Sequence, residues 1–251
     1  MLRTNIAPEN LVKDKDYTVR YSNNYLPTVN ALVTITGRGN YTGTIELNFK
    51  ITSAKITYER PMNITTVYTG YPTNGLTSEQ QNSYIKVTTP TQSNVAYSSE
   101  LPKCQNGTYA CSDDEKIYDS TIVPKFTNVG VHTVWYKITA TGYETIFGTF
   151  TIKITPKKLP VPSVYGDYIY TGLVQSPSWI NYNSKFMNMS GQTTGVQANT
   201  YSVKFDLTDP NVEWIDSAGS SDRSRIVNWT IQNLSIKDHE EVQETFIKYG
   251  E

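Results

Sequence analysis

A strand–turn–strand pattern occurs three times along this chain of 251 residues and limits what the chain can fold into. In each copy, a segment with alternating apolar residues leads into a polar turn, and a second alternating segment follows. The copies run from Ala31 to Ile51, from His132 to Ile154, and from Tyr201 to Trp214 with a closing segment from Ile226 to Ile231. Such alternation indicates strands with one buried face. The repetition predicts an all-β fold of tandem modules, and it favours a scaffold or binding protein over an enzyme.

The second segment of each copy ends in an apolar triplet, and these triplets set the expected module boundaries. The triplets are Leu47, Phe49 and Ile51; Phe150, Ile152 and Ile154; and Val227, Trp229 and Ile231. The spacing between successive triplets suits small β-sandwiches, and the wider first spacing leaves room for extra loops in the middle one. We expect modules at 1–52, 53–156 and 157–233. A tail at 234–251 has no predicted structure.

The stretches that begin at Thr52 and Thr155 are expected to be linkers. The second is proline-rich and is typical of a semi-rigid spacer.

The module at 1–52 lacks a segment that opens the other two. The second and third modules open with a similar strand and turn, Val67 to Asn74 and Tyr168 to Pro177, and residues 1–52 have no counterpart. We therefore expect an incomplete module with an exposed strand edge. Because open edges are usually covered or paired, residues 1–52 are a candidate for oligomer formation or edge-strand complementation. The tail, another subunit or a docking surface could supply the cover.

Charge and hydropathy exclude several classes of partner. The formal net charge is −1 and only 18% of the residues are charged, so no basic field indicates nucleic acid. No stretch approaches the roughly 18 apolar residues that span a bilayer, so no membrane insertion is expected. The stretch from Met1 to Asp16 contains no apolar core of a signal peptide, so none is visible in this chain.

The two cysteines, Cys104 and Cys111, flank an Asn106-Gly107 turn signal. A turn of this size can bring the two sulfurs together as a disulfide, and two free thiols are an equal alternative. No further Cys or His lies nearby, whereas a structural metal site needs four ligands. We expect no metal and no cofactor.

Residues that could carry catalysis are few. His132 is in register with the apolar residues of its strand and is expected to be a half-buried strand residue, and His239 is expected to be solvated. The acidic run Asp113 to Glu115 lacks calcium-loop spacing and is expected to be a solvated loop. The glycine-rich segment Gly37 to Gly43 is flanked by strands and indicates a hairpin turn, not a phosphate-binding loop. No catalytic residue is expected.

Three exposed aromatic residues are candidates for stacking on a sugar: Trp135, Trp179 and Tyr182. Trp135 is out of register with the apolar residues of its strand. The alternative for all three is ordinary packing on a sheet surface or at a module interface.

Two stretches in the first module resemble the Ig-like repeats of bacterial surface proteins. Asp16 to Asn24 reads DYTVRYSNN, and Thr34 to Thr44 reads TITGRGNYTGT, close to the pattern of that group. Thr127 to Thr145 is similar to the related MBG-type repeat, and the third module resembles a further variant. The matches together cover about Asn10 to Ile231. This chain departs from the family pattern in three ways. The first module lacks its opening strand, Val29 lies near a position where the family usually has glycine, and a cell-wall sorting motif is absent.

The resemblance implies an Ig-like β-sandwich in each module and a non-catalytic role at a surface. Such repeats occur in cell-wall adhesins of anaerobic gut bacteria and on virion proteins of the phages that infect them. The resemblance thus implies either a virion structural protein, such as a capsid decoration or fibre, or an adhesion or spacer segment of a cell-wall protein. The expected partners are proteins of the virion or the host surface, with glycans as a second candidate. The expected location is the virion surface or the bacterial cell surface.

Overall fold

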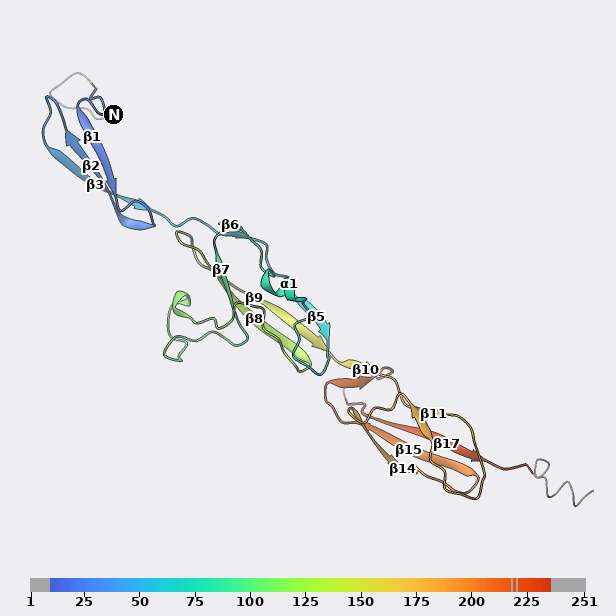
Figure 1. Cartoon of the computed structure of the whole chain (residues 1–251). Coiled ribbons are helices and arrows are strands. Elements are labelled where there is room, and N and C mark those ends of the chain that lie inside the picture. Colours follow the sequence, from blue (N-terminus) through green and yellow to red (C-terminus); the bar gives the residue numbers. More distant parts are fainter. Residues whose placement is uncertain (1–9, 218, 220, 236–251) are drawn as a thin grey trace, which may run out of the picture. The chain divides into compact units, whose positions relative to one another are not determined.

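The computed structural model describes residues 10–217, 219 and 221–235, and over these residues nearly all of the regular secondary structure is β-strand (Figure 1). The described helices are the five-residue α1 (Ser78–Asn82) and one 3-10 turn (Asp113–Glu115). Strands follow one another along the whole described chain and form several small sheets. The all-β class predicted from alternation is confirmed.

The chain divides into two compact units. The first comprises Met1–Asn63, Leu76–Pro124 and His132–Ile152, and the second comprises Ile64–Gly75, Lys125–Val131 and Lys153–Glu251. These limits do not follow the expected modules 1–52, 53–156 and 157–233, which stay a prediction. From residue 236 on, the expected tail and His239 lie outside the described residues.

The first sheet contains three antiparallel strands in the order β1-β2-β3 (Figure 1). Its strands are β1 (Tyr17–Ser22), β2 (Thr28–Gly37) and β3 (Thr44–Ile51). The segment from Gly37 to Gly43 forms the connection between β2 and β3, as the sequence predicted. The Gly37 N–H donates to the Gly43 carbonyl at 2.9 Å, and Gly43 has a φ of 98°, a left-handed conformation that favours glycine.

The second sheet has four strands in the order β5-β9-β8-β7. They are β5 (Ile64–Val67), β9 (Ile146–Thr155), β8 (Gly130–Thr139) and β7 (Asn94–Ser98). Alternate residues of β8 and β9 are buried, as their sequence pattern predicts. A two-stranded sheet, β4 (Thr57–Tyr58) with β6 (Val87–Thr89), contributes Tyr58, whose ring lies edge-on to Tyr136 of β8.

The third sheet has four strands in the order β12-β17-β15-β14. They are β12 (Tyr168–Ile169), β17 (Ser224–Gln232), β15 (Asn199–Leu207) and β14 (Met187–Gly191). Two small sheets accompany it: β11 (Ser163–Tyr165) with β13 (Ser178–Ile180), and β10 (Lys157–Leu159) with β16 (Val212–Trp214). Phe205, Trp214 and Trp229 form the fully buried centre of its core.

The expected linker after Thr155 is in part a strand. Lys157–Leu159 pairs in parallel with Val212–Trp214, and Leu159 is buried. The prediction of a spacer was wrong for these three residues, because the strand that pairs with them lies far along the chain and leaves no local signal.

The three sheets share one strand order, and the first lacks one member of it. In the second and third sheets, an opening strand (β5 or β12) lies beside the last strand (β9 or β17). The Tyr68 N–H donates to the Thr155 carbonyl and the Tyr170 N–H to the Gln232 carbonyl, each at 2.9 Å. The first sheet has the counterparts of the other three strands only, so β3 is an edge strand among the described residues.

A polar cluster around Asp209 ties separate segments of the second unit together. The Tyr68 hydroxyl donates to Asp209 Oδ2 at 2.7 Å, and the Asn211 backbone N–H donates to Asp209 Oδ1 at 2.8 Å. The Val129 N–H donates to Asn211 Oδ1 at 2.7 Å. Burial would raise the pKa of Asp209, but hydrogen bonds from Asn211 and Tyr68 outweigh it and hold that pKa below its ordinary value. The hydrogen bond to Asp209 is also the main reason that the pKa of Tyr68 is raised.

Replacing Tyr68 by Phe should lower the free energy of unfolding of the second unit by about 2 kcal/mol, because a carboxylate loses a hydrogen bond in a half-buried position. Urea titration followed by tryptophan fluorescence measures this, since Trp179, Trp214 and Trp229 all lie in that unit. An unchanged midpoint would mean that water replaces the tyrosine hydroxyl at no cost.

Asp209→Asn should change how the stability of the second unit depends on pH. The lowered pKa of Asp209 gives a stabilisation that is present above the ordinary Asp pKa of about 3.9 and is lost as pH falls toward the lowered folded value. Wild type should therefore lose more stability than Asp209→Asn between about pH 5 and pH 2 in the same urea titration. Asp167→Asn, in an exposed loop, is the matched control, and equal pH dependence of all three proteins would contradict the role of Asp209.

Candidate functional site

The first sheet has one apolar and one polar face, and the strand register shows how they arise. Rows across the sheet join Val19, Ile35 and Ile45, and then Tyr21, Val33 and Leu47. The rows between them point to the opposite face and are mainly polar: Thr18, Thr36 and Thr44, then Arg20, Thr34 and Glu46. Because side chains alternate along a strand, this register places the apolar set on a single face.

Among the described residues, the apolar face of the first sheet is half-buried at Val19, Val33 and Ile35 and exposed to solvent at its other positions. Tyr21 is 59% exposed, Ile45 51% and Leu47 54%. Phe150, which takes the place of Leu47 in the second sheet, is only 3% exposed. In the first sheet, Leu47 of the corresponding apolar triplet is therefore exposed, whereas Phe49 and Ile51 are half-buried.

The area of this open face is in the range of an interaction site. Three strands spaced about 4.8 Å apart, and the six paired positions of β1 rising about 3.4 Å each, give a face of roughly 290 Å². Contiguous apolar patches of a few hundred Å² on a soluble domain mark surfaces that bind a partner. We call this surface, formed by Val19, Tyr21, Val33, Ile35, Ile45 and Leu47, the open face.

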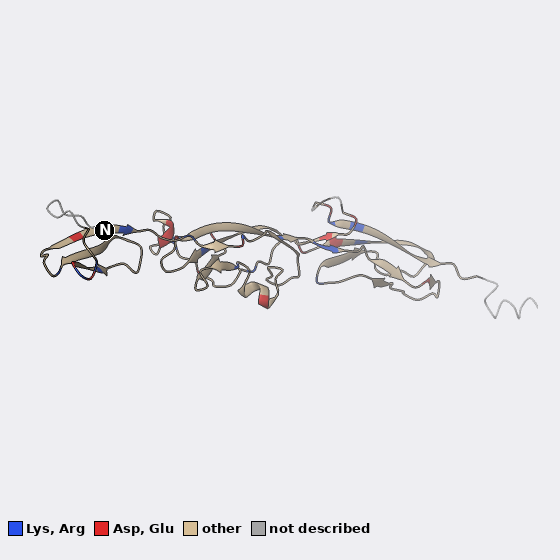
Figure 2. Cartoon of the chain, turned by 90° about the horizontal axis from the view of Figure 1, so that it is seen from above, with Lys and Arg blue, Asp and Glu red and all other residues tan. Residues whose placement is uncertain are grey.

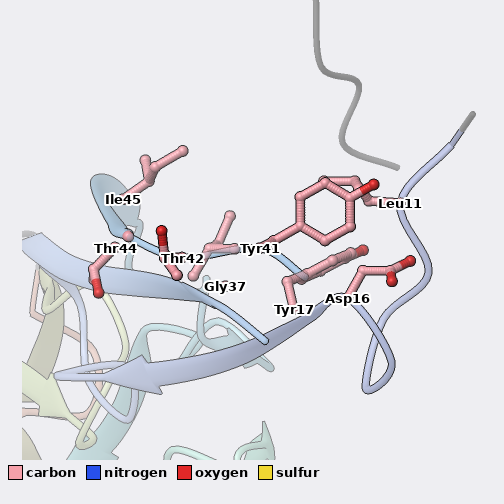
Figure 3. A pocket seen from close by; sticks show the side chains of 10 residues that line it. Leu11, Asp16, Tyr17, Gly37, Tyr41, Thr42, Thr44 and Ile45 are labelled. Atoms are coloured by element: carbon pink, nitrogen blue, oxygen red, sulfur yellow. The ribbon is translucent and has the colours of Figure 1, made fainter. Parts of the chain in front are cut away.

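A pocket of about 280 Å³ lies where the open face meets the β2–β3 turn (Figure 3). Tyr17 and Tyr41 present their rings to it, with Ile35 and Ile45 from the strands and Leu11 from the segment before β1. The Asp16 carboxylate at the rim accepts a hydrogen bond from the Val12 N–H at 2.8 Å. This lining suits an apolar or aromatic side chain, and it contains no nucleophile paired with a base.

Two of the three aromatic stacking candidates are engaged with the protein core. The Trp179 ring lies 4.8 Å from Phe205, edge-on, and the Tyr182 ring lies 5.8 Å from the same residue. Since Phe205 is fully buried, these two rings cover the core of the third sheet. Trp135 alternates with buried Val134 and Tyr136, so it points to the other side of β8, where it is half-buried. Of the three, Trp135 is the one that could stack on a ligand.

Cys104 and Cys111 form a disulfide that closes a small loop. Cys104 is buried, and its carbonyl accepts a hydrogen bond from the Gly107 N–H at 2.9 Å, so the Asn-Gly turn is formed between the two cysteines. The acidic run follows this loop as the 3-10 turn, where Glu115 accepts hydrogen bonds from Ser112 and Asp113 pairs with Lys116. These two carboxylates are already paired with the protein.

Groups that could support catalysis or metal binding are scarce in the part of the chain that the structure describes. No group of three or more His, Cys, Asp or Glu residues there could hold a metal ion. His132 lies half-buried in β8. Acidic and basic residues are interspersed along the strands, with no large field of one sign among the described residues (Figure 2).

None of the described helices is long and apolar enough to cross a membrane. A comparison with known proteins finds no family model that matches this chain and no curated protein similar to it. The open face is thus the best-defined candidate site.

The open face is the feature that sequence reasoning missed. The missing opening strand indicated an open edge, but the open face follows from a second absence: no small sheet covers β1, β2 and β3 among the described residues. The signal was available, because residues 10–52 contain enough strand segments for one layer only.

Truncating the side chains at two equivalent strand positions, Phe150 and Leu47, should lower the free energy of unfolding by different amounts. Phe150→Ala should lower the free energy of unfolding by about 3 to 5 kcal/mol, because it opens a cavity in a filled core. Leu47→Ala should change it by less than about 1 kcal/mol, because the side chain is already solvated. Urea titration followed by circular dichroism compares the two variants, and a large loss for Leu47→Ala would mean that the open face is covered in solution.

The two sulfurs should resist alkylation until the protein is reduced. Intact protein treated with iodoacetamide should gain no label, and two labels should appear after reduction under denaturing conditions. Mass spectrometry counts the labels. Labelling of native protein without reductant would contradict the disulfide, and the double variant Cys104→Ser with Cys111→Ser is the control for labelling elsewhere.

Proposed function

We propose that this chain is a non-catalytic structural and binding protein of tandem Ig-like modules, displayed on a surface. Its most fitting role is as a virion component, such as a capsid decoration or fibre protein. The alternative is an adhesion or spacer segment of a bacterial cell-wall protein.

Two side-chain contacts and a shared strand order support two-layered, Ig-like modules. In the first unit, Tyr58 of a small sheet packs against Tyr136 of the second sheet, and the hydroxyls lie 3.1 Å apart. In the second unit, Trp179 of a small sheet packs against Phe205 of the third. The repeated strand order, with the opening strand beside the last, gives both four-stranded sheets the same plan. The sequence resemblance points to the same architecture.

The observation that carries the assembly role is the open face of the first sheet. A solvent-exposed apolar face of this size is costly for a protein that works alone, and an assembly removes that cost by covering it. Mixed and sparse surface charge also suits a component that packs beside other proteins without electrostatic steering. The alternative, an adhesion segment, draws its support from Trp135, the half-buried ring that points away from the core.

The two roles predict different binding partners. A virion component should co-sediment with assembled capsids of its phage, and an adhesion segment should bind host cells or glycans. The open-face variant Leu47→Asp should lose at least about tenfold in capsid affinity, because a charge must then be desolvated at the contact. Trp135→Ala is the matched control and should bind capsids like wild type.

Loss of glycan binding in Trp135→Ala, with no capsid binding by either protein, would favour the adhesion role. The genomic context gives an independent check. Neighbouring capsid and tail genes would support the virion role, and a signal sequence upstream in the same reading frame would refute it.

A further inference from the structure

The outer edge of β3 has the backbone geometry of a strand-binding site. In the third sheet, the Gln232 carbonyl accepts the Tyr170 N–H, and in the second the Thr155 carbonyl accepts the Tyr68 N–H. Thr52 follows Ile51 as Gln232 follows Ile231 and Thr155 follows Ile154. By this correspondence the Thr52 carbonyl faces the outer edge, where no strand pairs with it among the described residues.

The two opening strands define what this edge should bind. Tyr168 and Ile169 pair in parallel with Ile231 and Gln232, and the Tyr168 ring lies 5.7 Å from Trp229. Each opening strand is followed three residues later by a glycine in the left-handed region, Gly70 with φ 84° and Gly172 with φ 75°. The required occupant is an extended segment with an aromatic or β-branched side chain facing inward and a glycine at the third position after the last apolar one.

Residues 244–250, Glu-Thr-Phe-Ile-Lys-Tyr-Gly, fit this requirement. Aligned on the glycine, Ile247 takes the place of Val67 and Ile169, and Phe246 takes the place of Tyr168. Two positions depart: Lys248 stands where both opening segments have Tyr, and Tyr249 stands where both have Thr. We propose that residues 244–250 of one copy of this chain add as a parallel strand to the β3 edge of a second copy.

The net charge of the two regions and the length of the chain before Phe246 favour residues 244–250 as the segment that binds the β3 edge. Residues 10–52 contain five Lys or Arg and three Asp or Glu, a net charge of +2, and residues 236–251 contain two Lys and five Asp or Glu, a net charge of −3. The stretch from Ser235 to Phe246 can span at most about 37 Å when extended. Opposite charges favour the encounter, and the span allows the segment to reach another molecule.

The added strand would bring apolar surface to the open face. Phe246 would lie beside Ile51 with its ring toward Phe49, as Tyr168 lies beside Ile231 with its ring toward Trp229. Each copy offers one edge and one donor segment, so the contact is head-to-tail and can propagate along a row of copies. This inference deepens the proposed function, because it names the partner of the incomplete first sheet, and it rests on the same open surface.

The test uses the full chain and two variants that each lose one half of the contact. The acceptor variant lacks residues 244–251 and keeps the β3 edge. The donor variant, Lys50→Pro, keeps residues 244–250 but removes one backbone N–H from the outer edge of β3. The Lys50 N–H points to the same side as the Thr52 carbonyl, because the two residues are two positions apart in the strand. Proline is tolerated at such an edge position because no ladder bond inside the sheet is lost. Circular dichroism checks folding, and Leu47→Asp replaces Lys50→Pro if the proline variant does not fold.

Analytical ultracentrifugation from about 1 to 200 µM should show wild-type mass rising at least twofold with concentration, as a contact of roughly micromolar affinity requires. Each variant alone should stay a monomer, and their equimolar mixture should form dimers and nothing longer. Phe246→Asp should abolish association, whereas Val242→Asp, outside the segment, should leave it unchanged.

A monomeric wild type, a variant that associates alone, or a mixture that does not dimerise would each overturn the proposal. A labelled peptide of residues 163–174, which contains the opening strand of the third sheet (Tyr168–Ile169), probes the edge directly. Binding of this peptide by a wild-type chain that stays monomeric would show that the edge accepts a strand from another source, which refutes the second copy as donor. Capsid or glycan binding is measured separately, so its failure and the failure of self-association are distinguishable.

Discussion

A sheet with one apolar face needs a second layer to cover that face, and the rest of this structure depends on how each sheet obtains such a layer. Every long strand carries apolar residues at alternate positions, so one face of each sheet must leave water to gain hydrophobic stabilisation. The third sheet buries Phe205 and Trp229, with Trp179 of a small sheet packed against Phe205, and the second sheet buries Ile152. The first sheet repeats the pattern with Leu47 and Ile45 and leaves them exposed. The same local rule thus yields two filled cores and one exposed apolar surface.

Polar interactions play a narrower part, and they join segments that hydrophobic packing alone would leave loosely connected. Asp209 accepts a hydrogen bond from Tyr68, which is distant in sequence, and Asn211 accepts one from the Val129 backbone. Arg223 adds donors to the Leu207 and Asp209 carbonyls. The ion pairs of Lys86, Lys158 and Lys204 each have a solvent-exposed lysine and contribute little. Specific hydrogen bonds at chain crossings therefore matter more to the second unit than its surface charges.

Local patterns predicted the strands well, because period-two alternation is a property of single segments. The all-β class, the apolar triplets and the turn from Gly37 to Gly43 could all be read directly from the chain. The strand at Lys157–Leu159 could not, since its two lysines and the neighbouring prolines resemble a linker, and only the distant Val212–Trp214 makes it a strand. Trp179 and Tyr182 looked like surface aromatics for the same reason, because their contact with Phe205 joins residues that are far apart in sequence. The open face was half predicted: the missing edge strand is a local absence, whereas the missing cover is a property of the whole sheet.

The parallel pairing of opening and last strands also sets an order of events during folding. In the third sheet, Tyr168 must wait for Ile231, much later in the chain, before their pairing can form. In the first sheet, the widest pairing joins Thr28 and Ile51, which are far closer in sequence. Contacts that are close in sequence form fastest, so the first sheet can assemble while the others are still incomplete. During synthesis on the ribosome the nascent chain would then present its apolar face early, before the residues after β17 have been made.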